Sequence, residues 1–410
     1  MKNIFFLLIV IILSLSLTAA STPEERLKSY QKHLEMKEKS PFKKLEWKSI
    51  GPYFMGGRID DIEGYNNNPY KFYIASASGG LWVTENNATT WKPIFDYESS
   101  ITIGDIAVSQ TDENLIYVGT GEQNSSRSSY AGTGVFKTTD GGKTWENVGL
   151  TDSHHIGKII IDPVDNNIVF VAALGHLFTD NEERGLYKTT DGGKTWKRIL
   201  YISPKTGAID VVMHPENRNI LYAATWQRDR KAWNFTECGP ESALYKSTDG
   251  GETWTKSMNG FPQNEYVGRI GLAVTPAKPG SVYALLDNQE PKPEEKKKDT
   301  NKDKKSGDAN NNLFITNIKG AEVYRSDDEG ETWTLTHEQP LEPTIYFTYG
   351  YYFGQIRVAP DNADTIYILG VPLMKSIDGG KTFKDISQQG GIYGDNGVHA
   401  DMQALTPLSP

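Results

Sequence analysis

Three arginines recur at nearly the same place in a repeated pattern of this 410-residue sequence. Arg58 and Arg269 stand in Gly-Arg-Ile, and Arg357 stands in Gly-Gln-Ile-Arg. Arginine presents a planar fork of donors that suits bidentate contacts to a carboxylate, so these residues are candidates for binding a ligand. The acids that could act beside them are Glu122, Asp105 and Asp401. Of these, Glu122 in the Gly-Thr-Gly-Glu turn is the candidate for catalysis, and the others are candidates for ligand binding.

The sequence lacks the short motifs of other common active sites. Gly-x-Ser-x-Gly, His-Glu-x-x-His and paired cysteines do not occur. Gly-Gly-Lys-Thr recurs, but a phosphate-binding loop needs a glycine five residues before its Gly-Lys, where this chain has Lys137, Lys188 and Lys375. His154 and His155 are adjacent and point to opposite faces of a strand, so one is interpreted as a rim residue rather than half of a metal site. We predict no metal and no cofactor.

Charge and the N-terminal sequence limit the partners and the compartment. A net charge of −9 argues against binding to nucleic acid. Residues 1–20 combine a basic start, a short apolar run and small residues, which predicts a cleaved signal peptide and a secreted, periplasmic or cell-surface protein with no membrane span in its mature form. Cys238 is the only cysteine, so no intramolecular disulfide can form. Residues 21–43 are highly charged and predict a helical leader.

One octapeptide recurs along the rest of the chain. TTDGGKTW occurs at 138–145 and again at 189–196, and close variants follow at 247–254, 326–333 and 376–383. A degenerate copy, TENNATTW, occupies 84–91. The period is about 50 residues, and each period holds four short β-branched or aromatic runs separated by turn residues. This pattern predicts an all-β fold, a β-propeller of four-stranded blades with six visible and a partial seventh.

The repeated octapeptide has a structural interpretation. Its aspartate can cap the amides of its own turn, its glycine can adopt positive φ, and its terminal Trp or Phe can pack on the neighbouring sheet. A catalytic group is not needed five times around a ring, so these acids are interpreted as structural. They are Asp140, Asp191, Asp249, Asp328 and Asp378.

Two segments depart from the period. Residues 287–312 contain almost nothing apolar, which predicts a disordered insert within the propeller of residues 44–410. Residues 45–50 could complete the final sheet, and 397–406 could form the first strand of a seventh blade. Because the middle strands of that blade are missing, either the ring holds six full blades or, as we expect, the chain is truncated at its C-terminus.

With its octapeptides, the opening WKSIGPYFMGGRI and the closing GVHADMQAL, the chain resembles the bacterial-neuraminidase-repeat (Asp-box) propellers, in particular exported bacterial proteins similar to the sortilin N-terminal domain. The resemblance covers about residues 44–405 and implies the fold. It does not imply one function, because the architecture hosts sialidases, polysaccharide hydrolases, assembly factors and sorting receptors.

Two functions follow from the resemblance. In xyloglucanase-like relatives a catalytic Asp precedes the Gly-Gly of the first blade, whereas this chain has Ala77-Ser78 there. We therefore expect a non-catalytic binding or scaffold module for a peptide, protein or glycan. The alternative is a glycoside hydrolase of sialidase-like or related type that uses Glu122 and the arginines, although Asp60 replaces the proline of the sialidase Arg-Ile-Pro signature. Convergence of the arginines and Glu122 in one pocket would favour the hydrolase.

Overall fold

A computed structural model describes residues 22–45, 57–126, 128–231, 233–292, 318–341, 350–387 and 401–407, and the chain divides into units 1–55 and 56–410. In the first unit a helix, α2, spans Pro23–Lys39. It begins with a capping box in which Thr22 and Glu25 each accept the other's backbone N–H, and it buries none of its residues. Within the described residues, no helix is long and apolar enough to cross a bilayer. The predicted signal peptide lies outside these residues and stays a prediction.

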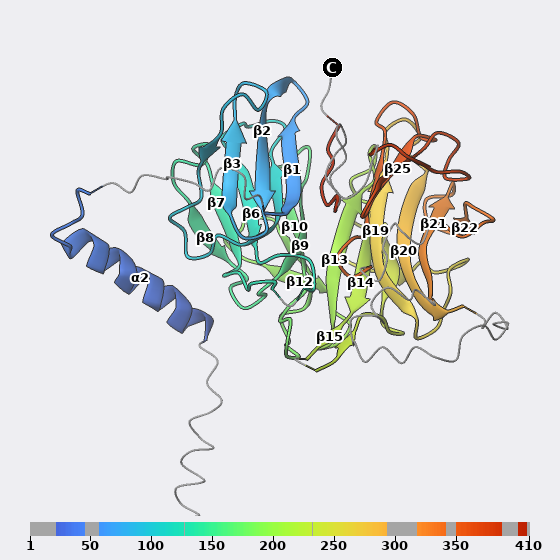
Figure 1. Ribbon diagram of the computed structural model, residues 1–410, viewed down its shortest axis with the longest axis horizontal. Coiled ribbons are helices and arrows are strands. Elements are labelled where there is room, and N and C mark those ends of the chain that lie inside the picture. The colour runs from blue at the N-terminus through green and yellow to red at the C-terminus, as the bar shows by residue number, and fades with distance from the viewer. Residues whose placement is uncertain are drawn as a thin grey trace, which may run out of the picture. The chain divides into compact units, whose positions relative to one another are not determined.

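The second unit is a β-propeller of six four-stranded antiparallel blades, as predicted (Figure 1). Blades one and two comprise β1 (Ile59–Tyr65), β2 (Asn68–Ser76), β3 (Gly80–Thr84), β4 (Lys92–Pro93), β5 (Ile103–Val108), β6 (Ile116–Thr120), β7 (Val135–Thr138) and β8 (Glu146–Gly149). Blades three and four comprise β9 (Ile156–Ile161), β10 (Val169–Ala173), β11 (Gly185–Thr189), β12 (Lys197–Leu200), β13 (Thr206–Met213), β14 (Leu221–Gln227), β17 (Ala243–Ser247) and β18 (Thr255–Lys256). Blades five and six comprise β19 (Val267–Val274), β20 (Val282–Pro291), β21 (Ile318–Ser326), β22 (Thr334–Leu335), β23 (Gln355–Val358), β24 (Ile366–Leu369), β25 (Leu373–Ser376) and β26 (Lys384–Asp385).

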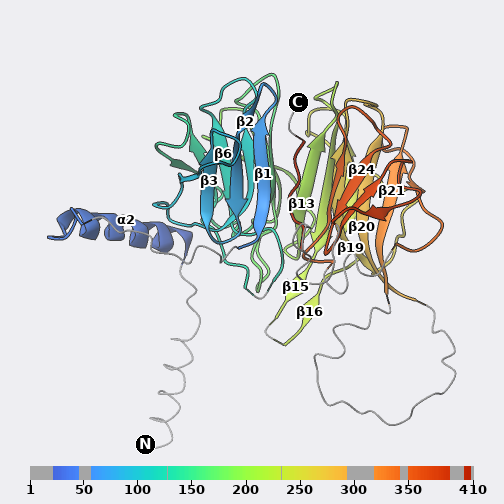
Figure 2. The same cartoon turned by 45° about the horizontal axis from the view of Figure 1, so that its top comes forward.

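The innermost strand of each blade lies beside that of the next, and glycines permit this close approach. A Cβ on Gly104 would lie 2.1 Å from the carbonyl oxygen of Ile156, and one on Gly157 would lie 2.4 Å from that of Ile209. These contacts leave no room for a side chain, so the Ile-Gly pairs of the inner strands set the spacing of the blades. Figure 2 shows inner strands β1, β13 and β19 around the centre of the propeller.

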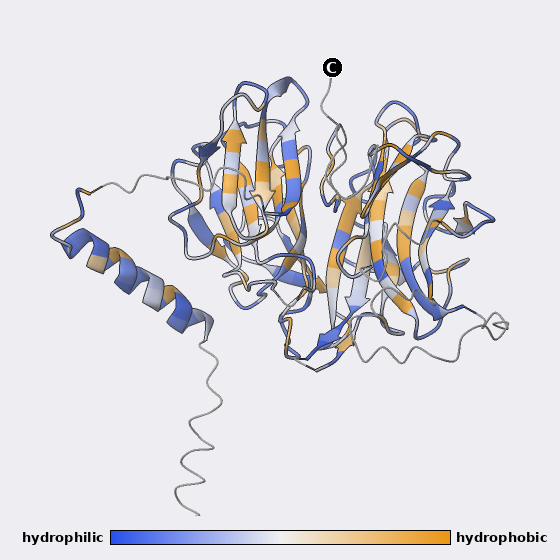
Figure 3. Cartoon of the chain, viewed as in Figure 1, coloured by the Kyte–Doolittle hydropathy of each residue, from blue (hydrophilic) through white to orange (hydrophobic). Residues whose placement is uncertain are grey.

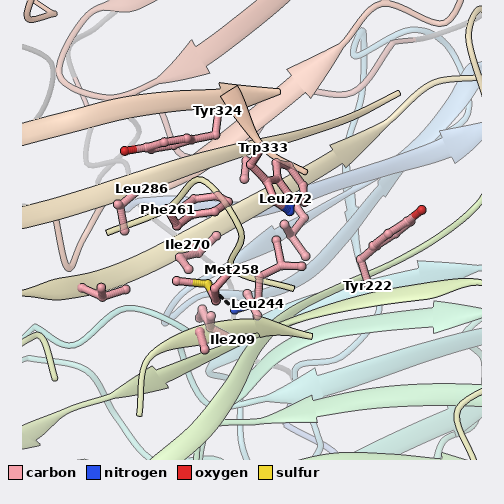
Figure 4. Close-up of a cluster of buried hydrophobic side chains, with 14 of the residues drawn as sticks. Ile209, Tyr222, Leu244, Met258, Phe261, Ile270, Leu272, Leu286, Tyr324 and Trp333 are labelled. Atoms are coloured by element: carbon pink, nitrogen blue, oxygen red, sulfur yellow. Dashed lines mark hydrogen bonds between the residues drawn. The ribbon is translucent and has the colours of Figure 1, made fainter. Parts of the chain in front are cut away.

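Apolar residues follow the strands, and polar residues occupy the connections (Figure 3). The largest core cluster fills the space between blades four and five, where Phe261 stacks on Tyr324 with centroids 4.1 Å apart and meets Trp333 edge-on (Figure 4). The Trp333 indole donates to Ser257 of the preceding blade. Similar clusters lie between the other blades that follow one another along the chain, from one to six, and the side chains of both blades contribute to each.

Each octapeptide that retains its aspartate forms the turn between the third and fourth strands of its blade. In blade two, one carboxylate oxygen of Asp140 accepts bonds from the amides of Lys143 and Thr144, at 3.0 Å each, and the other accepts from the Thr144 hydroxyl. The adjacent Trp145 donates its indole N–H to Ile94 of blade one at 2.7 Å. The same turn bonds recur at Asp191, Asp249, Asp328 and Asp378.

Three predictions need correction. The insert predicted from residue 287 begins later, because β20 continues to Pro291 and pairs with β21; residues 293–317 lie outside the described residues. Blade four also contains an element that was not predicted: a hairpin of β15 (Asp229–Arg230) and β16 (Phe235–Thr236) is inserted between its second and third strands. Residues 401–407 of the predicted seventh-blade strand do not form a strand, and the amides of Asp401 and Met402 instead bond to Val371 and Gly370.

Candidate active site in the central channel

Charged residues occupy equivalent positions on the inner strands and face the centre of the propeller. Each directly precedes an isoleucine or a valine, and they are Asp61, Asp105, Lys158, Asp210 and Arg357. They line a cavity of about 340 Å³ together with Glu63, Arg269 and the segment Leu405–Pro407. This volume is near the lower end for ligand sites. Seven titratable side chains line this one space, and we take it as the candidate site.

The aspartates of this ring bind the backbone of the next blade. Asp61 accepts the amide of Ile106 at 3.2 Å, and Asp105 accepts that of Ile159 at 2.6 Å. Asp210 accepts the amide of Leu272 at 2.9 Å. One carboxylate oxygen of each aspartate therefore links its blade to the next one. Asp105 was predicted from the sequence to bind a ligand, and in the structure one of its oxygens makes this link between blades.

Lys158 balances the acids on the side of blades one to three. Its ammonium lies 2.9 Å from Asp105 and 4.0 Å from Asp61. Burial alone would lower the pKa of Lys158, but the two carboxylates outweigh burial and raise it, so the lysine stays charged. Burial raises the pKa of Asp105 well above its usual range, and Lys158 opposes that shift.

Glu63 has the chemistry of a general acid. It lies two residues after Asp61 on β1, so its side chain points to the same face, and it lines the cavity while partly exposed. Burial, with the charge of Asp61 as a second cause, raises the pKa of Glu63 to about 7. Among the described residues, its carboxylate makes no hydrogen bond. A carboxyl group that keeps its proton near neutral pH can donate it to a leaving group.

A second polar cluster lies at the mouth of the channel, around the loop that follows β6. Glu122 is fully buried and its carboxylate is bound by the guanidinium of Arg58 through both oxygens. The hydrogen bond to Glu122 raises the pKa of Arg58. Arg269 donates to Asn124 at 2.9 Å and to Gln123 at 2.8 Å. Two of the three arginines thus converge on one loop, and that loop contains Glu122.

The remaining predicted residues lie elsewhere. Arg357 donates to the carbonyl of Leu405 at 3.0 Å and to the side chain of Gln355 at 2.6 Å, so it contacts the channel wall and not Glu122. Asp401 is exposed, with a φ of +73°, and its amide binds Val371. The convergence expected of a sialidase-like site is therefore partial, and Glu122 is engaged by Arg58.

Asp60 is the most unusual acid of the mouth. It is 1% exposed and neither carboxylate oxygen has a hydrogen-bond partner among the described residues. Burial, followed by the charge of Glu122, raises the pKa of Asp60 well above its usual range. The sequence analysis noticed Asp60 only as a departure from a sialidase motif, although it lies beside the Arg58 and Glu122 pair.

Sequence reasoning missed Glu63, Lys158 and Asp210. A signal for them exists in the repeats, since aligning the inner strands on the isoleucine or valine at 62, 106, 159 and 211 places Asp61, Asp105, Lys158 and Asp210 in one column. The alternation of a strand then assigns Glu63 to the face of Asp61. The raised pKa of Glu63 could not be predicted from the sequence, because it depends on groups from several blades.

Comparison with known proteins finds a similarity between part of the chain and sortilin-like proteins. The Sortilin-Vps10 family model, described as sortilin, neurotensin receptor 3, matches residues 133–319. A stretch of 92 residues is 32% identical to vacuolar protein sorting/targeting protein 10 of Colletotrichum graminicola, covering 22% of this chain and 5% of that protein. The resemblance to the sortilin-type propeller is confirmed for this part of the chain.

Longer matches reach xyloglucanases. A probable oligoxyloglucan-reducing end-specific xyloglucanase of Neosartorya fischeri is 24% identical over 402 residues, covering 86% of this chain and 43% of that protein. A xyloglucanase of Acetivibrio thermocellus is 22% identical over 384 residues, covering 85% and 40%. The chain thus spans less than half the length of these relatives.

Two crystal structures share the fold. An ancestral GH74 enzyme superposes with a TM-score of 0.56 at 17% identity, covering 82% of this chain and 39% of its own. The GH74 enzyme of Niastella koreensis gives 0.54 at 18% identity, covering 79% and 46%. At these identities the structures support the propeller architecture and no more.

Proposed function

We propose that this chain is part of a glycoside hydrolase that acts on a β-glucan of the xyloglucan type. The observation that carries the proposal is the similarity to xyloglucanases along 85–86% of the chain. It favours the glycoside hydrolase, which the sequence offered as the alternative, over the non-catalytic module. It also gives the polar channel a ligand class, since a glycan is neutral and rich in hydroxyl groups that carboxylates and arginines can bind.

In this proposal Glu63 is the proton donor, and Asp61, which lies on the same face of β1 and near the Lys158 ammonium, is the second carboxyl group. Glycoside hydrolysis needs one protonated and one ionised carboxyl group. Glu63 supplies the first because burial raises its pKa to about 7. Asp61 and Asp105 each hold one carboxylate oxygen on the backbone of the next blade, and Lys158 keeps their charge balanced.

The shape of the cavity bears on the substrate. A cavity walled by inner strands from all six blades admits the end of a glycan more readily than the middle of a polymer. Oligosaccharides and chain ends are therefore the expected substrates.

The test is an assay of xyloglucan oligosaccharides and polymeric xyloglucan with the whole chain, analysed by mass spectrometry. We expect hydrolysis of oligosaccharides that falls as pH rises through about 7, because Glu63 loses its proton. Glu63→Gln is expected to lower the rate at least 100-fold. Glu85→Gln, on an exposed residue of blade one, is the matched control. Full activity in Glu63→Gln would contradict the role of this residue.

A second function is favoured by one observation. The xyloglucanase-type acid is absent from Ala77-Ser78, and the carboxylate of Glu122 is held by Arg58. A non-catalytic glycan-binding module fits this. Saturable binding of oligosaccharides measured by calorimetry, with no product after long incubation, would support binding and overturn hydrolysis.

A further inference from the structure

Three potential metal ligands meet at the edge of blade three, outside the channel. Asp152 and His154 lie on the loop between β8 and β9, and His176 follows β10. Their ligand atoms all lie within 4.8 Å of one another. One oxygen of Asp152 is 3.5 Å from Nε2 of His154 and 3.4 Å from Nε2 of His176. No short motif marks this group, because His176 lies far along the chain from the other two.

These separations match those of a coordinated ion. Zn²⁺ binds histidine nitrogen and carboxylate oxygen at about 2.0–2.2 Å in tetrahedral geometry, which places neighbouring ligand atoms about 3.3–3.5 Å apart. The two imidazole rings stack with centroids 3.6 Å apart and an interplanar angle of 22°. Because the lone pair of each Nε2 lies in its ring plane, the two nearly parallel rings must rotate apart for both atoms to bind one ion.

Contacts made by His176 and Asn181 help to hold this group in place. Nδ1 of His176 lies 2.9 Å from the hydroxyl of Thr179, which leaves Nε2 directed at the cluster, where it is buried and makes no hydrogen bond. Metal-binding histidines commonly use their second nitrogen in this way. Asn181 bridges the two loops, since it accepts the amide of His176 at 2.9 Å and donates to the carbonyl of Asp152 at 3.3 Å.

The backbone at His154 is also unusual. His154 has a φ of +58°, which L side chains rarely adopt. Its carbonyl accepts the amide of Gly132 at 2.7 Å, and this contact helps to hold the conformation. His155 points the opposite way, with Nδ1 2.8 Å from the carbonyl of Glu122. The strained residue is thus the one whose side chain faces Asp152 and His176, an arrangement often found at functional sites.

We propose that Asp152, His154 and His176 bind a divalent transition metal ion, with Zn²⁺ as the best match. Imidazole and carboxylate ligands suit Zn²⁺ and its neighbours better than Ca²⁺ or Mg²⁺, which prefer oxygen. Three protein ligands leave one position of the tetrahedron for water or a substrate oxygen. The site is distinct from the channel, and the proposal does not depend on the proposed glycan activity.

The experiment is titration of the metal-free, untagged chain with ZnCl₂, followed by calorimetry and by the thermal unfolding midpoint. We expect one ion per chain and a rise in Tm, because the folded state binds the ion and the unfolded state does so weakly. His154→Ala and His176→Ala should each weaken Zn²⁺ binding at least tenfold. The control is His33→Ala, which removes an exposed histidine of α2. MgCl₂ should cause no shift.

The outcomes separate clearly. Unchanged affinity in both histidine variants, or a stoichiometry that falls with His33→Ala, would overturn the site. If His154→Ala unfolds the chain because of the strained backbone, Asp152→Asn tests the same site without changing that backbone, and it too should weaken binding.

Discussion

The acidic residues of the repeated turns and those near the channel are chemically alike, but their pKa values shift in opposite directions. At the surface, the pKa of Asp140 falls to about 2, first because the amide of Thr144 donates to it and then because two threonine hydroxyls do. In the channel, burial raises the pKa of Glu63 to about 7 and that of Asp60 well above its usual range. The comparison teaches that hydrogen-bond donors and solvent, rather than residue type, decide which acids hold charge.

The largest effect is expected at the mouth of the channel. Arg58→Ala leaves Glu122 buried without its partner, and we expect the free energy of unfolding to fall by about 3–5 kcal/mol. Denaturant unfolding at pH 7 measures it. The double variant Arg58→Met with Glu122→Leu removes both charges and should recover most of the loss. A loss below about 1 kcal/mol for Arg58→Ala would show that the pair is well solvated, and the contrast with the surface turns would be lost.

The second prediction concerns the pH dependence of the two kinds of acid. The pKa of Glu63 rises from 4.5 to about 7 on folding, so its favourable contribution to stability is present below about pH 4.5 and is lost as pH rises through 7. Glu63→Gln should therefore be more stable than the parent at pH 8 by about 1–2 kcal/mol, and equal to it at pH 4. Unfolding curves at both pH values measure this.

Asp140 is the matched control because its shift has the opposite sign. Its pKa is lowered from 3.8 to about 2, so its contribution is present above about pH 4 and is lost as pH falls through 2. Asp140→Asn should therefore lower the Tm at pH 7 and have little effect at pH 2. The same pH profile for both variants would contradict the comparison.

The smallest effect is expected in the degenerate first octapeptide. Ala88 adopts a φ of +64° at the position where Gly142 has +87° in blade two. Since positive φ is costly for alanine, Ala88→Gly should raise the free energy of unfolding by about 0.5–1 kcal/mol. Gly142→Ala is the reverse test, and it should destabilise the chain more, because the added Cβ would lie 2.8 Å from Ile94. A destabilising Ala88→Gly would be inconsistent with strain at this turn.

Much of the fold could be predicted because the sequence repeats the local patterns that determine it. The octapeptides and the alternating strands of about 50-residue repeats indicated the propeller and the number of visible blades, and the structure has six such sheets. The β15 and β16 hairpin and the true start of the insert were missed, since each is a single insertion with no counterpart in other blades.

The candidate site was predicted only in part. Arg58, Arg269 and Glu122 were chosen from the repeats, and the structure brings them to one loop. That Arg58 binds Glu122 was not foreseen, because the residues are 64 positions apart and no pattern links them. Arg357 looked equivalent to the other two, but the chain end near Leu405 engages it.

The sequence by itself determined the blades and the turns that close them, because hydrogen bonds within an octapeptide and alternation along a strand are local. Only the tertiary structure decided which acids hold a proton and which side chains share a space. Glu63 owes its raised pKa to burial among inner strands, and Asp152, His154 and His176 meet because two loops fold together. Such properties depend on solvent exclusion and distance in three dimensions, which sequence spacing does not contain.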